Sequence, residues 1–85
     1  MEQRIGTITI LISDRNRSTE VNQFLSHYSD IILCRQGLPF HNRPVAVIAL
    51  IVEGTMDQIN TLTGQLGRLE GVECKAALTK LRVEN

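Results

Sequence analysis

The stretch that decides the fold is Val45-Ala46-Val47-Ile48-Ala49-Leu50-Ile51-Val52, which contains no charged or hydrogen-bonding side chain. It is too short to cross a membrane. Its β-branched residues, with Pro44 before it and Gly54 after it, favour a strand. A strand that exposes one face to water alternates apolar and polar residues, whereas this one has no polar face. The sequence therefore predicts a central strand that is covered on both sides.

The residues before this stretch predict a strand, a helix and a second strand. Residues 4–13 alternate in character with a period of two, which is typical of a strand. The apolar spacing then changes to that of a helix face, which predicts a helix with Ser18 as N-cap and an end near residues 27–29. Residues 31–36 predict a second strand, which stops at Gly37 before a loop with two prolines.

The residues after the apolar stretch predict a second helix and a last strand. Thr55 and Gln58 have the spacing of a capping box, in which each side chain bonds the backbone N–H of the other residue. Helical spacing continues to about Leu66, and Gly67 is suited to end a helix. Residues 72–79 alternate apolar and polar side chains, as a half-exposed edge strand does.

The resulting order of strand, helix, strand, strand, helix, strand predicts one α+β domain over residues 1–85. Two such half-repeats are typical of the ferredoxin-like βαββαβ fold. Right-handed crossovers that each skip one strand give a four-stranded antiparallel sheet of order 4-1-3-2, with both helices on one face. Cys34 and Cys74 are then expected on opposite edges of the sheet, too far apart for a disulfide.

Helices on one face leave the other face of residues 45–52 without cover. An exposed apolar face of this size is predicted to pack against a second copy of the chain. The second strand offers another route, because consecutive apolar residues at a sheet edge can pair with a neighbour. The two routes together would give a dimer of dimers. The interface residues predicted from this pattern are Ile31, Ile32, Leu33, Ile48 and Leu50.

Charge and composition restrict the function classes. Nine basic and nine acidic residues cancel, which removes the positive field that nucleic-acid binders use, so direct binding to DNA or RNA is not expected. The N-terminus has neither the basic start nor the cleavage site of a signal peptide. We therefore expect a cytoplasmic protein without a membrane segment.

A candidate ligand site lies between the first strand and the first helix. The short polar side chains of Asp14, Arg15 and Asn16, with the amide groups of the helix start, suit a small anionic or amino-acid-like ligand. A solvated turn with a helix cap is the simpler interpretation of the same residues. Arg35 is an unusual charge in an apolar strand. It either anchors an anion or carboxylate or marks where an edge strand meets solvent.

No metal, cofactor or catalytic centre is expected. Cys34, His41 and His27 have the chemistry of zinc, nickel or iron ligands, but a core cysteine and surface histidines are the favoured interpretation. The carboxylates are scattered over caps, turns and edges, and no Gly-rich phosphate loop is present. The sequence therefore favours a non-enzyme.

Two segments carry a family resemblance. They are Arg35-x-Gly37-Leu38-Pro39-Phe40 and Leu62-Thr63-Gly64-Gln65-Leu66-Gly67-Arg68-Leu69-x-Gly71-Val72-x-x-Lys75. With the apolar strand between them, they resemble the small iron-only hydrogenase system regulators, over nearly the whole chain from Ile5 to about Lys80. Members of that family are ACT-like.

The resemblance implies a regulatory or ligand-sensing module that acts as a homo-oligomer. ACT domains commonly hold ligands at the first strand-to-helix turn, which here is Asp14, Arg15 and Asn16. No DNA-binding arm is expected, so regulation of transcription would act through a protein partner. The alternative implied by the family name is a non-catalytic assembly or scaffold partner in hydrogenase maturation, with no small ligand.

Overall fold

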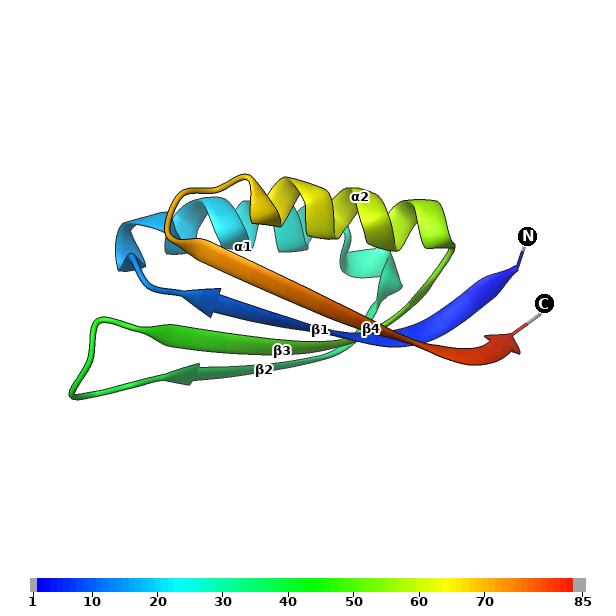
Figure 1. Ribbon diagram of the computed structural model, residues 1–85, viewed down its shortest axis with the longest axis horizontal. Helices are drawn as coiled ribbons and strands as arrows, with labels where there is room; N and C mark the ends of the chain where they lie inside the picture. Colours follow the sequence, from blue (N-terminus) through cyan, green and yellow to red (C-terminus); the bar gives the residue numbers. More distant parts are fainter. Residues whose placement is uncertain (1, 84–85) are drawn as a thin grey trace.

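The computed structural model describes residues 2–83, which form four strands and two helices (Figure 1). The elements in chain order are β1 (Gln3–Ile12), a 3-10 turn (Arg15–Arg17), α1 (Ser18–His27), a 3-10 turn (Ser29–Ile31), β2 (Ile32–Pro39), β3 (Ala46–Gly54), α2 (Met56–Gly67) and β4 (Val72–Val83). No helix in this part of the chain is long and apolar enough to cross a membrane.

The strands form one antiparallel sheet of order β2-β3-β1-β4. Both helices lie side by side on one face of this sheet, and the opposite face carries no helix (Figure 1). The predicted α+β fold and the strand order 4-1-3-2 are thus confirmed. β1 and β3 occupy the centre, while β2 and β4, with Cys34 and Cys74, form the edges.

The hydrophobic core lies between the sheet and the two helices. Its buried side chains are Ile8, Ile10 and Ile12 of β1, Val21 and Leu25 of α1, Ile31 of the second 3-10 turn, Ile48, Leu50 and Val52 of β3, and Ile59, Leu62 and Leu66 of α2. Each fully buried aliphatic side chain contributes roughly 1.5–3 kcal/mol relative to exposure. The alternation of β1 and the helical spacing of α1 and α2 therefore reflect one shared core.

The β3 residues that face away from the helices are not the ones that the sequence analysis assigned to the interface. Ile48 is 7% exposed and Leu50 is 1% exposed, so these two residues of the predicted interface belong to the core. The alternate residues Val47, Ala49 and Ile51 point to the face without helices, since side chains alternate along a strand. The interface itself stays a prediction. Its residues on β3 are now predicted to be these three instead of Ile48 and Leu50.

The two helices begin in different ways. The predicted capping box of α2 is confirmed: Thr55 N donates to Gln58 Oε1 at 2.9 Å and Gln58 N donates to Thr55 Oγ1 at 3.2 Å. The prediction that Ser18 is the N-cap of α1 is wrong. Asp14 caps a preceding 3-10 turn instead, and α1 continues from that turn without a side-chain cap.

One predicted end differs from the structure, and another agrees with it. β2 does not stop at Gly37 but continues to Pro39, because backbone pairing with β3 persists beyond the polar residues. The end of α2 agrees with the prediction, since Gly67 is its last residue. The left-handed conformation in the turn that follows falls on Gly71, whose φ is 79°.

Candidate functional site

The turn between β1 and α1 is held by its own hydrogen bonds. Asp14 Oδ1 accepts a hydrogen bond from Asn16 N at 3.0 Å, which caps the 3-10 turn. Ser13 donates to Gly71 O twice, from its backbone nitrogen at 2.8 Å and from its hydroxyl at 3.1 Å. The hydrogen bonds of Ser13 hold the turn against the segment that leads into β4. The contact between Asp14 and Asn16 is the one expected of a solvated turn with a helix cap.

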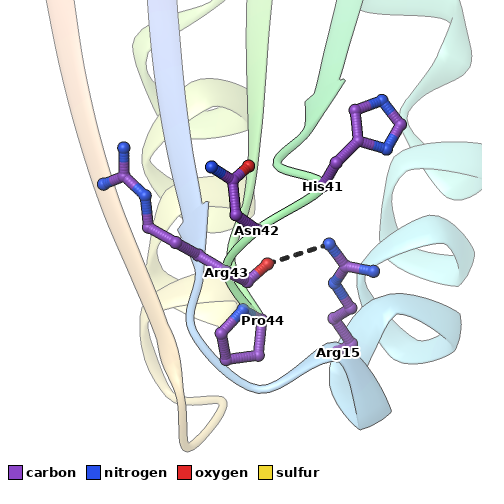
Figure 2. A pocket seen from close by; sticks show the side chains of 5 residues that line it. All are labelled: Arg15, His41, Asn42, Arg43 and Pro44. Carbon is purple, nitrogen blue, oxygen red and sulfur yellow. Dashed lines mark hydrogen bonds between the residues drawn. The ribbon is translucent and has the colours of Figure 1, made fainter.

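Arg15 reaches away from this turn to the loop between β2 and β3. Its NH2 group donates to Phe40 O at 2.6 Å and to Arg43 O at 3.1 Å, and Figure 2 shows the second of these hydrogen bonds. The Arg43 guanidinium lies over the Phe40 ring, with Cζ 4.9 Å from the ring centroid. Arg15 therefore fixes a loop whose backbone lies far from it in the sequence.

A shallow depression of about 370 Å³ lies beside this loop, lined by Arg15, His41, Asn42, Arg43 and Pro44. The His41 and Arg43 side chains point in opposite directions, so the polar groups do not converge on one point (Figure 2). A ligand site normally encloses its ligand and aims several polar groups at it. This depression is too open, and its polar side chains point in too many directions, for it to be the leading candidate for a ligand site.

Arg35 lies elsewhere, on the edge strand β2. It pairs with the buried Leu50 and so faces the helix side of the sheet, where its NH2 group donates to Asn22 Oδ1 of α1. A cavity of about 220 Å³ opens at this edge, lined by Leu25, Ser26, Ser29, Ile32 and Arg35. Arg35 therefore bridges β2 and α1 beside a small pocket that contains two hydroxyl groups.

The four predicted ligand-binding residues thus fall in two places. Asp14, Arg15 and Asn16 stabilise turns at one end of the molecule, while Arg35 lines the α1–β2 cavity. Ser26 and Ser29 were not predicted as site residues. A signal for them was present, since Asn22, Ser26 and Ser29 follow the i, i+4, i+7 spacing of one helix face and continue it past the end of α1.

The candidate metal ligands do not converge. In the described part of the chain, no group of three or more His, Cys, Asp and Glu residues is arranged to hold a metal ion. His27 ends α1, Cys34 lies on β2, and His41 follows β2 in the loop. Both cysteines are free thiols.

Among the residues that the structure describes, two groups have a shifted pKa. The pKa of Arg17 is raised, first because its side chain donates to Glu20 Oε1 at 2.8 Å and then because of the charge of that carboxylate. Burial raises the pKa of the Cys74 thiol, because a thiolate loses hydration there. Neither shift creates an acid–base pair.

The sheet face without helices is mostly apolar over β2 and β3, with Gln36, opposite Ala49, as a polar exception. Leu38 lies opposite Val47, and Cys34 lies opposite Ile51, so apolar side chains from both strands adjoin. Leu38 is 54% exposed and Ile51 is 42% exposed. Of the predicted edge residues, Leu33 is 58% exposed, Ile32 is half-buried and Ile31 is in the core.

Comparisons with known proteins agree with this fold. A family model described as "Iron-only hydrogenase system regulator, putative" (TM1266-like) matches residues 4–76. The solved structure of uncharacterized protein TM1266 from Thermotoga maritima has a TM-score of 0.86 and 34% identity, covering 92% of this chain and 99% of that one.

A curated relative is longer than this chain. An uncharacterized transcriptional regulator of Methanocaldococcus jannaschii, MJ0080, is 29% identical over 84 residues. The match covers 99% of this chain but only 63% of the relative. Since the family model spans most of the sequence and the structural neighbour has the same fold, this chain belongs to the TM1266-like family of iron-only hydrogenase system regulators.

Proposed function

We propose that this chain is an ACT-like, non-catalytic regulatory module that senses a small oxyanion, such as a carboxylate or phosphate, and acts as a homo-oligomer. The observation that carries the sensing role is the cavity lined by Arg35, Ser26 and Ser29. Guanidinium and hydroxyl groups are all hydrogen-bond donors, and a guanidinium matches the planar geometry of a carboxylate or phosphate edge.

The surroundings of Arg35 favour this role. The hydrogen bond to Asn22 uses one of its nitrogens and restrains a side chain that would otherwise lose conformational entropy on binding. Leu25 and Ile32 supply apolar walls beside these donors. A volume of about 220 Å³ suits a ligand of few atoms, smaller than those held by most drug-sized pockets.

The homo-oligomer is supported by the apolar sheet face. A domain of this size buries only about 60% of the surface of its unfolded chain, so a second copy would add needed apolar burial. Val47, Ala49 and Ile51 of β3 offer that area beside Leu38 of β2. Leu33 adds an exposed apolar side chain at the sheet edge.

The route to gene regulation is proposed from the relatives. The transcriptional role in the name of the archaeal relative belongs to a longer protein. We propose that this chain acts through a protein partner and in the cytoplasm, where such a regulator meets its target. The apolar sheet face also suits a scaffold role in hydrogenase maturation, which is the second candidate function.

Thermal unfolding with a panel of oxyanions tests the sensing role. A ligand that binds only the folded state raises the melting temperature in a saturable way. At least one of phosphate, sulfate, acetate and citrate should do so for the wild type, and Arg35→Gln should remove the effect. Lys75→Gln, which removes a positive charge from an exposed site on β4, should retain it. No stabilisation of the wild type by any of these anions would overturn sensing and favour the scaffold.

A further inference from the structure

Asn22 holds the guanidinium of Arg35 without neutralising its charge. Asn22 is an exposed residue of α1, and its Oδ1 accepts the hydrogen bond from Arg35 NH2 on β2. An arginine side chain has donors only, so the amide must present its oxygen and not its nitrogen. No ion pair joins Arg35 to a carboxylate in residues 2–83, which the structure describes. The positive charge of Arg35 is therefore oriented but uncompensated.

Two other arginines of the chain are held differently. Arg17 donates to Glu20 at 2.8 Å and Arg4 lies 3.7 Å from Glu2, so each is paired with a carboxylate. A guanidinium in such a pair already has the anionic partner that an oxyanion ligand would have to replace. An amide accepts a hydrogen bond from the guanidinium but brings no charge that competes with a ligand. Of these three arginines, Arg35 is the one whose charge is available to an anion.

The place of the cavity in the fold makes this charge important. Ser26 lies in the last turn of α1 and Ser29 lies just beyond it, so the cavity opens beside the C-terminal end of this helix. The helix dipole places a partial negative charge at that end, which disfavours an anion. The two hydroxyls can donate hydrogen bonds but carry no charge. Arg35 supplies the positive charge of the cavity lining, and a carboxylate beside it would cancel its attraction for an anion.

We propose that Asn22 is a positioning residue of the oxyanion site: its neutral amide orients Arg35 and leaves the guanidinium charge for the ligand. This inference rests on the sensing role proposed above and adds to it, because Asn22 lies outside the cavity lining and acts through Arg35. A carboxylate at position 22 would therefore block binding of an anion although it keeps the contact between α1 and β2.

Three substitutions separate the effect of charge from that of shape. Asn22→Asp keeps the size of the side chain and an acceptor for Arg35 but adds a negative charge. Asn22→Ala removes the acceptor and adds no charge. Asn60→Asp makes the same change of charge at an exposed position of α2 outside the cavity lining. The probes are phosphate, sulfate, acetate and citrate at constant ionic strength. The measurement is the anion concentration that gives half of the maximal rise in melting temperature.

The proposal predicts an order of effects that a purely structural role would not produce. For an anion that stabilises the wild type, Asn22→Asp should raise the half-maximal concentration about tenfold, the size expected when a unit charge is placed beside a bound anion near a protein surface. Asn22→Ala should raise it less, about threefold, because Arg35 loses its orientation but keeps its charge. Asn60→Asp should leave it unchanged. Without anion, Asn22→Asp should melt no lower than the wild type, since Arg35 still joins α1 to β2.

The outcomes distinguish this inference from the sensing role itself. If Asn22→Asp binds the anion as well as the wild type does, or better than Asn22→Ala does, the role of Asn22 is wrong while the oxyanion site stands. If no anion stabilises the wild type, the sensing role is overturned and this inference with it. A melting temperature of Asn22→Asp well below that of the wild type, measured without anion, would also contradict the proposal, because Arg35 would then not pair with the carboxylate.

Discussion

Gly71 lies directly against Asp14. Its φ of 79° places it in the left-handed region, and a Cβ atom added there would lie 2.9 Å from Asp14 Cβ. Its carbonyl oxygen accepts the 2.8 Å hydrogen bond from Ser13 N. The turn before β4 is thereby locked onto the turn after β1, which explains why a glycine stands at this position.

Replacing Gly71 tests this relationship. Gly71→Ala should lower the free energy of unfolding by roughly 1–3 kcal/mol, because alanine resists a positive φ and its methyl group meets Asp14. Gly64→Ala is the matched control. Gly64 lies inside α2 with nothing within 4 Å of an added Cβ, so alanine there should raise stability by about 0.5–1 kcal/mol. Urea denaturation measures both; equal effects would contradict the account of the turn.

The capping box of α2 gives a second stability prediction. Thr55→Ala removes the acceptor for Gln58 N and should cost about 0.5–2 kcal/mol in chemical denaturation. Thr61→Ala, at an exposed position of the same helix, should have no such cost, because alanine is the better helix former. A loss of the same size from Thr61→Ala would show that the cap is not the cause.

Arg15 should control the loop between β2 and β3. Arg15→Gln removes the hydrogen bonds to Phe40 O and Arg43 O, so amide hydrogens of residues 40–45 should exchange faster with solvent. Hydrogen-exchange mass spectrometry measures this change. Arg68→Gln, an exposed site beyond α2, serves as the control and should leave the loop unchanged. Unaltered exchange in Arg15→Gln would show that the loop is held by other contacts.

Burial of Cys74 predicts that the stability of the folded state depends on pH. Its raised pKa means that the folded state holds the thiol proton more tightly than the unfolded state does. The stability that this thiol contributes is fully present below the ordinary thiol pKa. It declines as the pH rises through the raised pKa of the thiol in the folded state. Iodoacetamide at mildly alkaline pH should therefore alkylate Cys74 more slowly in folded than in urea-unfolded protein, measured by mass spectrometry in a Cys34→Ser background. Equal rates would contradict the shift.

If the chain is a homo-oligomer, a charged substitution in the predicted interface should lower the mass of the particle in solution. The wild type should sediment as a dimer or larger species, and Ile51→Glu should shift it toward monomer, because a carboxylate would then be buried in an apolar contact. Met56→Glu is matched in exposure, at 40% against 42% for Ile51, but lies on the helix side and should not change the mass. A wild-type monomer at micromolar concentration in analytical ultracentrifugation would overturn the proposal.

The fold could be predicted from the sequence because its signals are local. Alternation in β1, helical spacing in α1 and α2, and the box of Thr55 and Gln58 each report on a few neighbouring residues. The face of β3 could not be predicted in the same way. Residues 45–52 are apolar throughout, so polarity does not reveal that Leu50 faces the helices and Ile51 faces away. Only pairing with β1 decides that register.

The candidate site was less predictable for a related reason. The acceptors of Arg15 are backbone carbonyls of a distant loop, and a carbonyl is present at every residue whatever its side chain. Arg35 was identified because a charge is unusual in an apolar strand. Its neighbours Ser26 and Ser29 become relevant only once α1 is packed against β2.

The central place of β1 has a consequence for synthesis of the chain. Ile8 pairs with Leu50 on one side and with Ala76 on the other, so β1 is synthesised before both of the strands that pair with it. Contacts so distant in sequence close slowly, because the intervening chain must lose entropy first. One edge of β1 therefore stays unpaired until residues 72–83 have emerged, and during that interval the nascent chain exposes a strand on which aggregation can begin.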